Sequence, residues 1–153
     1  MEVRKNTLIQ SSYFICEYTH LTPLSAIVQG KVIPPENLIS ELARFTYNMH
    51  QKELVHIDYS IGNILYEVNG GRIDFALIDN NRMNFGPVSF KAGIKNLVRL
   101  GLSVMQVTQL AEEYTRLRKV NVYVGLAYFL RFKSAEILRR EKKGRVKKFF
   151  GRG

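Results

Sequence analysis

The chain has 153 residues and a formal net charge of +10, and 46% of its residues are hydrophobic and 24% charged. This length and composition predict one globular domain and exclude a disordered, collagenous or low-complexity chain. The single cysteine, Cys16, excludes a disulfide framework, so a reducing, cytoplasmic setting is expected. The strongly apolar stretches are too short to span a bilayer, so no membrane span is expected.

The positive charge is concentrated at the C-terminus. Residues 131–153 contain ten Lys or Arg against two Asp or Glu, whereas the rest of the chain is nearly balanced. Three interpretations are open for the cations from Arg139 to Lys148: a solvated helix end, an anionic membrane surface, or nucleic acid. Phe149 and Phe150 favour the membrane over nucleic acid, because apolar anchors act together with basic groups at headgroups and no nucleic-acid fold signature is present.

The first half of the chain predicts a strand followed by a helix. Residues 12–18 are rich in aromatic and β-branched residues, which favours a strand that ends before His20. A linker with a short helix follows. A second helix begins after Pro34-Pro35 and runs to about Lys52, because apolar residues recur at helical spacing at Leu38, Leu42, Phe45 and Met49.

The second half of the chain predicts a β-hairpin and three helices. Residues 64–68 and 72–78 are short apolar runs separated by Asn69-Gly70-Gly71, whose glycines allow the positive φ angles of a tight turn. The helices are expected over about 89–102, 103–118 and 121–143. The inner face of the last helix is expected to contain Tyr123, Leu126, Leu130 and Phe132.

The loop between the first long helix and the hairpin contains the most informative motif. It reads His56-Ile-Asp58-Tyr-Ser-Ile-Gly-Asn63, and the hairpin's second strand ends on Asp79. Phosphoryl transfer needs a carboxylate to orient and deprotonate the acceptor hydroxyl, and oxygen ligands to hold Mg²⁺ against the nucleotide phosphates. A loop followed by a hairpin brings Asp79 back beside Asn63. We therefore expect Asp58, Asn63 and Asp79 to converge on one site.

In these residues the chain resembles the lipopolysaccharide kinase (Kdo/WaaP) family, which has a protein-kinase-like fold. The similarity extends from the strand over 12–18, through the loop and hairpin, to the segment over 95–100. The resemblance implies that Asp58 is the catalytic base and that Asn63 and Asp79 bind Mg²⁺. It also implies that the backbone of Glu17, Tyr18 and Thr19 is a hinge that binds the adenine of ATP, and that His56 is architectural.

The resemblance covers only the C-terminal catalytic lobe. The residues before the hinge-like strand contain no Gly-rich phosphate loop and no Val-Ala-Ile-Lys strand. The expected fold is therefore α+β, a protein-kinase-like C-lobe that is mainly helical with a small hairpin, its N-lobe largely absent. Residues 1–143 are assigned to this lobe and residues 144–153 to a basic tail.

By resemblance, the implied activity is ATP- and Mg²⁺-dependent phosphorylation of a sugar hydroxyl on lipopolysaccharide core, Kdo or heptose, with lipid A-core as acceptor. The implied location is cytoplasmic, peripheral on the inner face of the inner membrane. The alternative is a catalytically silent lobe that acts as a membrane-peripheral or protein-binding module.

For four further residues, the sequence favours an ordinary structural role over a functional one. His20 and His50 have no metal-ligand spacing and are expected at the surface, and Asp74 is expected to face solvent. For Arg82, an ion pair with a nearby carboxylate is favoured over a role in binding a phosphorylated substrate.

Overall fold

The computed structural model describes residues 2–5, 8–12 and 19–150, with side chains described from 19 to 142. The described strands form three small antiparallel sheets. They pair β1 (Glu2–Lys5) with β2 (Leu8–Ser12), β5 (Ile64–Asn69) with β3 (Thr22–Pro23) and β6 (Arg72–Leu77), and β4 (Leu54–His56) with β7 (Met83–Phe85).

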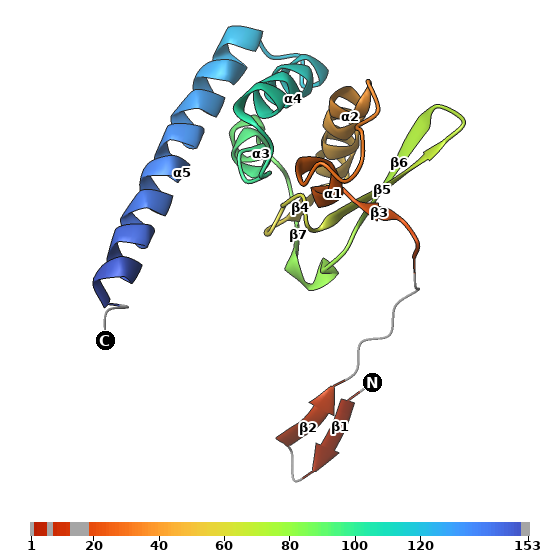
Figure 1. Ribbon diagram of the computed structural model, residues 1–153, viewed down its shortest axis with the longest axis vertical. Helices are drawn as coiled ribbons and strands as arrows, with labels where there is room; N and C mark the ends of the chain where they lie inside the picture. Colours follow the sequence, from red (N-terminus) through yellow and green to blue (C-terminus); the bar gives the residue numbers. More distant parts are fainter. Residues whose placement is uncertain (1, 6–7, 13–18, 151–153) are drawn as a thin grey trace.

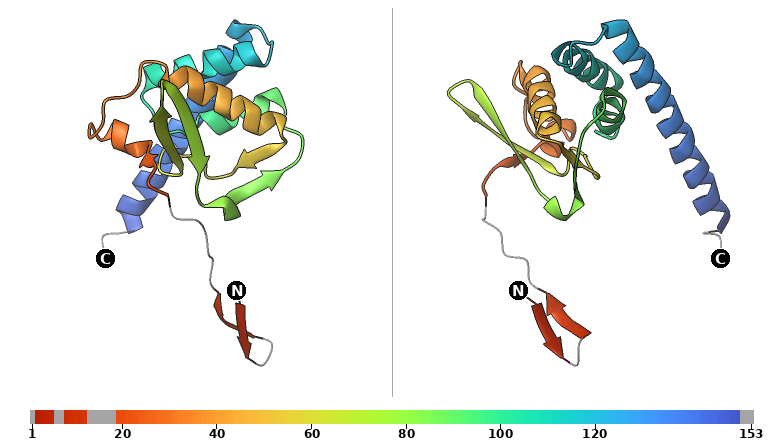
Figure 2. Two further views of the ribbon diagram at one scale, coloured as in Figure 1. Left: turned by 90° about the vertical axis from the view of Figure 1, so that its right-hand side faces the viewer. Right: turned by 180° about the vertical axis from the view of Figure 1, so that it is seen from behind.

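Helices make up most of the remaining described chain. They are α1 (Ser25–Val28), α2 (Leu38–Gln51), the 3₁₀ turn η1 (Asn80–Arg82), α3 (Phe90–Leu97), α4 (Val104–Leu117) and α5 (Val122–Phe150). Helix α2 packs against α4, and α4 packs against α5 (Figure 1). The β1–β2 hairpin lies apart from this helical core in all three ribbon views (Figures 1 and 2).

The predicted helix after Pro34-Pro35 and the predicted hairpin are both confirmed. The apolar stripe buries Leu38, Leu42 and Met49 against the core, as helical spacing requires. In the hairpin, Ile64 pairs with Leu77, and the turn places Gly70 at φ 58° and Gly71 at φ 85°. These positive values are the reason that the turn needs glycine.

Two of the later helices differ from the prediction at their ends. Helix α3 stops at Leu97 instead of about residue 102, because the Arg99 and Leu100 amides each bond a carbonyl three residues earlier and tighten the chain into turns. Helix α5 continues through Phe150, past the predicted end at 143. No helix in the described ranges is both long and apolar enough to cross a membrane.

The inner face of α5 was predicted partly wrong. Tyr123 is 82% exposed and Leu130 is 58% exposed, whereas Phe129 is fully buried. The contact face is set by Gly125, where a Cβ would lie 2.1 Å from Thr115 Oγ1 on α4. This close approach turns the stripe of Gly125, Phe129 and Phe132 toward the core, and Tyr123 and Leu130 fall on the outer side.

Candidate functional site

The predicted catalytic loop connects β4 to β5. Asp58 and Asn63 lie at its two ends, and the Asn63 side-chain amide joins them: Nδ2 donates to the Asp58 carbonyl oxygen at 2.9 Å and lies 3.4 Å from Asp58 Oδ2. Only the nitrogen of this amide can donate to a carbonyl, so Asn63 Oδ1 remains available as an acceptor. Two of the three predicted residues are therefore in direct contact.

Asp79 lies directly after the hairpin, beside the same loop. The Ile78 amide donates to the Asn63 carbonyl oxygen at 3.1 Å, and His56 Nε2 donates to the Ile78 carbonyl oxygen at 3.0 Å. The residue before Asp79 is thus hydrogen-bonded to both ends of the loop. Asp79 itself is exposed and has φ 62°, a left-handed conformation that aspartate tolerates better than most residues.

A buried polar chain holds the loop against the helices. Asn96 Nδ2 on α3 donates to the His56 carbonyl oxygen at 3.0 Å, which leaves Asn96 Oδ1 to accept from His50 Nε2 on α2 at 3.2 Å. His50 Nδ1 then accepts from the Tyr114 hydroxyl on α4 at 2.8 Å. The neutral imidazole is favoured because burial lowers the pKa of His50 to about 4.

This arrangement corrects the prediction for His50. The side chain is 2% exposed and not at the surface, because it links three helices through hydrogen bonds. Sequence spacing identifies metal ligands but not buried hydrogen-bond partners distant in the chain. His56 is also fully buried, and its Nδ1 has no hydrogen-bond partner in the part of the chain that the structure describes.

Tyr59 anchors the middle of the loop. It is fully buried, and its hydroxyl lies 2.7 Å from Thr46 Oγ1 on α2. Since Thr46 donates its own proton to the Leu42 carbonyl oxygen at 2.8 Å, Tyr59 is the donor. Burial raises the pKa of the Tyr59 phenol, which keeps it protonated. The buried Tyr59 side chain therefore holds the loop against α2, while Asp58 faces solvent.

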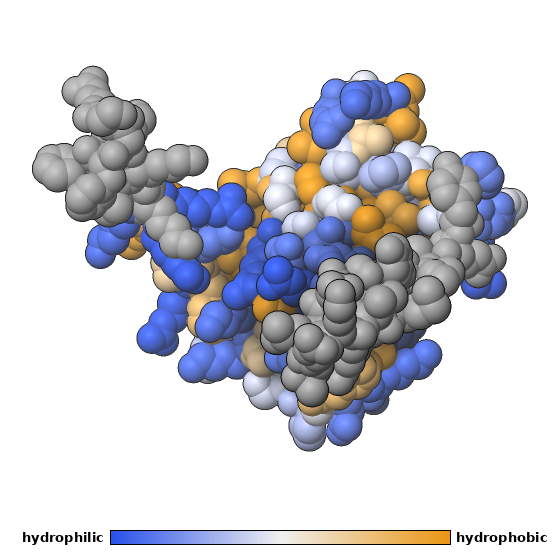
Figure 3. Space-filling view, turned by 90° about the horizontal axis from the view of Figure 1, so that it is seen from below, coloured by the Kyte–Doolittle hydropathy of each residue, from blue (hydrophilic) through white to orange (hydrophobic). Residues whose placement is uncertain are grey.

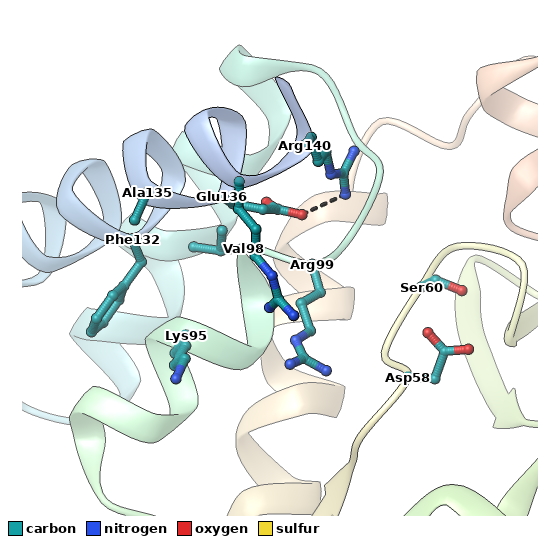
Figure 4. A pocket seen from close by; sticks show the side chains of 10 residues that line it. Asp58, Ser60, Lys95, Val98, Arg99, Phe132, Ala135, Glu136 and Arg140 are labelled. Atoms are coloured by element: carbon teal, nitrogen blue, oxygen red, sulfur yellow. Dashed lines mark hydrogen bonds and ion pairs between the residues drawn. The ribbon is translucent and has the colours of Figure 1, made fainter. Parts of the chain in front are cut away.

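A cleft of about 410 Å³ opens beside Asp58. Asp58 and Ser60 line one side, and residues from the α3 region and α5 line the other (Figure 4). Arg99 connects the two sides, because its guanidinium donates to the carbonyl oxygen of Ile57, the residue before Asp58. The segment over 95–100, which carried part of the family resemblance, therefore contacts the loop through Asn96 and Arg99.

The remaining predicted site residues are located as follows. Glu17, Tyr18, Cys16 and most of the predicted strand over 12–18 lie outside the described residues. Thr19 is exposed, and its Oγ1 accepts from the Leu21 amide at 3.3 Å. Arg82 forms no ion pair with a carboxylate of the described residues. Asp74 is partly exposed and pairs with Arg72 at 2.6 Å.

The donor groups at the site fit a magnesium ion better than a transition metal. No group of three or more His, Cys, Asp or Glu side chains comes together within the described residues. An amide oxygen from Asn63 and a carboxylate from Asp79 are hard donors, and Mg²⁺ takes one or two carboxylates while keeping waters and substrate phosphates. The residues present are compatible with Mg²⁺ bound together with a nucleotide.

Comparison with known proteins finds a structural likeness. No family model and no curated protein matches this chain. Among solved structures, WaaP in a complex with acyl carrier protein matches with a TM-score of 0.58 and 21% sequence identity. The match covers 78% of this chain and 58% of the WaaP chain, so this chain spans less than two thirds of that protein. The likeness shows the fold predicted from the sequence, an α+β protein-kinase-like C-lobe.

Proposed function

We propose that this chain is the catalytic lobe of a kinase-like phosphotransferase that uses ATP and Mg²⁺ to phosphorylate a sugar hydroxyl of lipopolysaccharide core, Kdo or heptose. The observation that carries the proposal is the contact between Asn63 and Asp58 on a loop immobilised by buried polar groups. The WaaP-like fold supports the same reaction class.

Asp58 is the proposed catalytic base. Its carboxylate is exposed at the edge of the cleft, and only one oxygen, Oδ2, has a described donor, at the long distance of 3.4 Å. The carboxylate is therefore free to accept a hydrogen bond from an acceptor hydroxyl and to take its proton. Asn63 and Arg99 hold the backbone on either side of it in position.

Asn63 and Asp79 are the proposed metal ligands, and the backbone over Glu17, Tyr18 and Thr19 is the proposed adenine-binding hinge. When bound, Mg²⁺ neutralises charge on the nucleotide phosphates. The protein's part is to present Asn63 Oδ1, whose amide nitrogen is already engaged, and the Asp79 carboxylate, whose oxygens have no described partner. Both groups lie on backbone segments joined by the hydrogen bond from Ile78 to Asn63.

A catalytically silent lobe is the second candidate. The observation that favours it is the absence from these 153 residues of a Gly-rich phosphate loop and its lysine strand. Such a lobe would act as a membrane-peripheral or protein-binding module. The complex of WaaP with acyl carrier protein makes a protein partner of that kind a candidate for this chain.

Binding of a manganese–nucleotide complex tests the proposed metal site. Mn²⁺ replaces Mg²⁺ as a paramagnetic probe, and its relaxation effect is measured with the 153-residue chain in the presence of ATP. We expect D79N to weaken binding about tenfold or more, because a carboxylate ligand is lost. The matched control is D74N, which removes a carboxylate from the same hairpin but breaks only an exposed ion pair with Arg72. Equal losses in both variants would contradict the metal assignment.

Turnover separates the two candidate functions. We expect the 153-residue chain alone to phosphorylate lipid A-core slowly, because no lysine or glycine loop holds the phosphates in line. D58N should abolish that residual turnover while leaving manganese–nucleotide binding within about twofold, since the base contacts the acceptor and not the nucleotide. Turnover that is unaffected by D58N would exclude Asp58 as the base, whereas nucleotide binding without any turnover would favour the silent lobe.

A further inference from the structure

The cleft beside Asp58 has a strongly basic wall. Four cations line it, and they come from two elements distant in the sequence: Lys95 and Arg99 from the α3 region, Arg139 and Arg140 from α5. Among the described residues, Glu136 is the only anion that lines this wall. Figure 4 shows Lys95, Arg99 and Arg140 on the side of the cleft opposite Asp58 and Ser60. Figure 3, seen from below, shows hydrophilic residues lying among hydrophobic ones on this face.

Two of these cations are held in position with donors to spare. Arg99 donates to the Ile57 carbonyl oxygen, and Arg140 donates to Glu136. Each contact uses one nitrogen of the guanidinium, which carries five N–H donors in all. The orientation of both groups is therefore determined before a ligand arrives, which reduces the entropy lost on binding.

The other two cations have no described partner. Lys95 and Arg139 form no ion pair or hydrogen bond with any residue in the described ranges, although both line the cleft. Glu136 is shared between Arg140 and Lys133, whose Nζ lies 3.6 Å from Oε2. The wall thus keeps a surplus of positive charge that no carboxylate in the described part of the chain neutralises.

The rest of the wall is apolar. Val98, Phe132 and Ala135 line the same side of the cleft as the cations. A surface that combines apolar atoms with hydrogen-bond donors suits a sugar ring that bears an anionic group, because the C–H face of the ring can pack on the apolar atoms. A bare inorganic anion would use only the donors.

We propose that this cleft is the acceptor site, in which Lys95, Arg99, Arg139 and Arg140 bind the phosphate or carboxylate of an anionic sugar and present its hydroxyl to Asp58. The inference rests on the proposed function and adds the charge of the substrate to it. Asn63 and Asp79, the proposed metal ligands, do not line the cleft, whereas the proposed base does. The cleft therefore belongs to the acceptor and not to the nucleotide.

Sugar binding without nucleotide tests the inference independently of catalysis. The 153-residue chain is titrated with glucose 6-phosphate, glucuronate, glucose and inorganic phosphate, and binding is followed by amide chemical shifts. We expect both anionic sugars to bind and glucose to bind at least about tenfold more weakly, because charge-assisted hydrogen bonds are roughly twice as strong as neutral ones. Raising the salt concentration should weaken the anionic sugars.

The double variant K95Q/R139Q removes the two cations without a described partner. It should weaken glucose 6-phosphate binding about tenfold or more. The matched control K91Q/R131Q removes the same charge from α3 and α5 at exposed positions outside the cleft. Equal weakening by both variants would overturn the proposal and indicate a general charge effect.

Four further outcomes would also overturn the inference. Equal binding of glucose and glucose 6-phosphate would exclude recognition of the anion. Inorganic phosphate that binds as tightly as glucose 6-phosphate would exclude recognition of the sugar. Displacement of glucose 6-phosphate by Mg²⁺–ATP would assign the cations to the nucleotide. Manganese–nucleotide binding that stays sensitive to D79N, without any binding of anionic sugars, would overturn the acceptor site while the proposed function stands.

Discussion

The exposed residues of the proposed site are held in position by hydrogen bonds in the surrounding structure. Asp79 has φ 62°, and the Arg82 amide donates to its carbonyl oxygen at 3.0 Å, which closes the η1 turn around it. Left-handed conformations of residues other than glycine cost about 1 kcal/mol and persist where the surrounding structure determines them. The supporting residues, His50 and Asn96, are buried and belong to α2 and α3, the helices before and after the loop and hairpin in the sequence.

The buried His50 predicts a loss of stability in acid. Its pKa falls from the ordinary value of 6.5 to about 4 in the folded protein, so the unfolded chain binds the proton more tightly. The stability due to the neutral His50 is therefore complete above pH 6.5 and is lost as the pH falls toward 4. A tenfold change in proton affinity corresponds to about 1.4 kcal/mol, so the total loss is about 3 kcal/mol.

Urea unfolding between pH 4 and pH 8 measures this effect. H50Q should flatten the pH dependence, because a glutamine amide can both accept from Tyr114 and donate to Asn96 without titrating. H20Q, at an exposed histidine, is the control and should keep the dependence of the parent protein. An unchanged pH profile in H50Q would show that another group is responsible.

At the scale of elements, the crossing of α4 and α5 determines which face of α5 is buried. Thr115 is fully buried, and its Oγ1 donates to the Ala111 carbonyl oxygen at 2.6 Å, which fixes the side chain's rotamer. Gly125 packs directly on this side chain. The close crossing brings the α5 residues from Phe132 to Arg140 to the wall of the cleft.

Alanine has a higher helix propensity than glycine, but G125A should nevertheless destabilise the protein. Its Cβ would lie 2.1 Å from Thr115 Oγ1, and overpacking of this kind costs about 1–3 kcal/mol. Thermal unfolding measures the change, and the additional substitution T115A should recover part of it by removing the nearest atom. G101A is the control, because its Cβ would meet Ile61 at an ordinary 3.6 Å. A G125A protein as stable as the parent would contradict the close crossing.

In the whole molecule, the cations from Arg139 to Lys148, which share one interpretation in the sequence, fall into two groups. Arg139 and Arg140 line the cleft beside Asp58 and belong to the lobe. Helix α5 continues beyond them to Phe150 (Figure 1). The membrane-binding hypothesis therefore applies to residues 143–153, and the cleft cations have a separate proposed role.

Sedimentation with vesicles tests the remaining tail. Binding should rise with the content of anionic lipid and fall with salt, since each Lys or Arg near the surface contributes about 1 kcal/mol within a Debye length. Replacing Phe149 and Phe150 by Ser should reduce the binding that persists at high salt, because the apolar part is less sensitive to screening. Removal of residues 143–153 should abolish binding. Equal binding to neutral and anionic vesicles would favour a solvated helix end.

The local structure and the motif of this protein can be predicted from its sequence. The stripe from Leu38 to Met49 predicts α2 because helical periodicity is a local property, and Gly70-Gly71 predicts the hairpin because only a few turn types join two adjacent strands. The spacing of Asp58 and Asn63 likewise predicts a contact that one loop can make. These features depend on neighbours within about twenty residues.

The contacts between segments that are distant in the sequence depend on how the whole chain folds. The burial of His50 depends on Asn96 and Tyr114, 46 and 64 residues away. The buried face of α5 depends on Thr115, and the basic wall of the cleft exists because that crossing brings Arg139 near Arg99. Periodicity identifies which residues share a helix face, but the packing partner selects which face is buried, and that choice is made only when the whole chain folds.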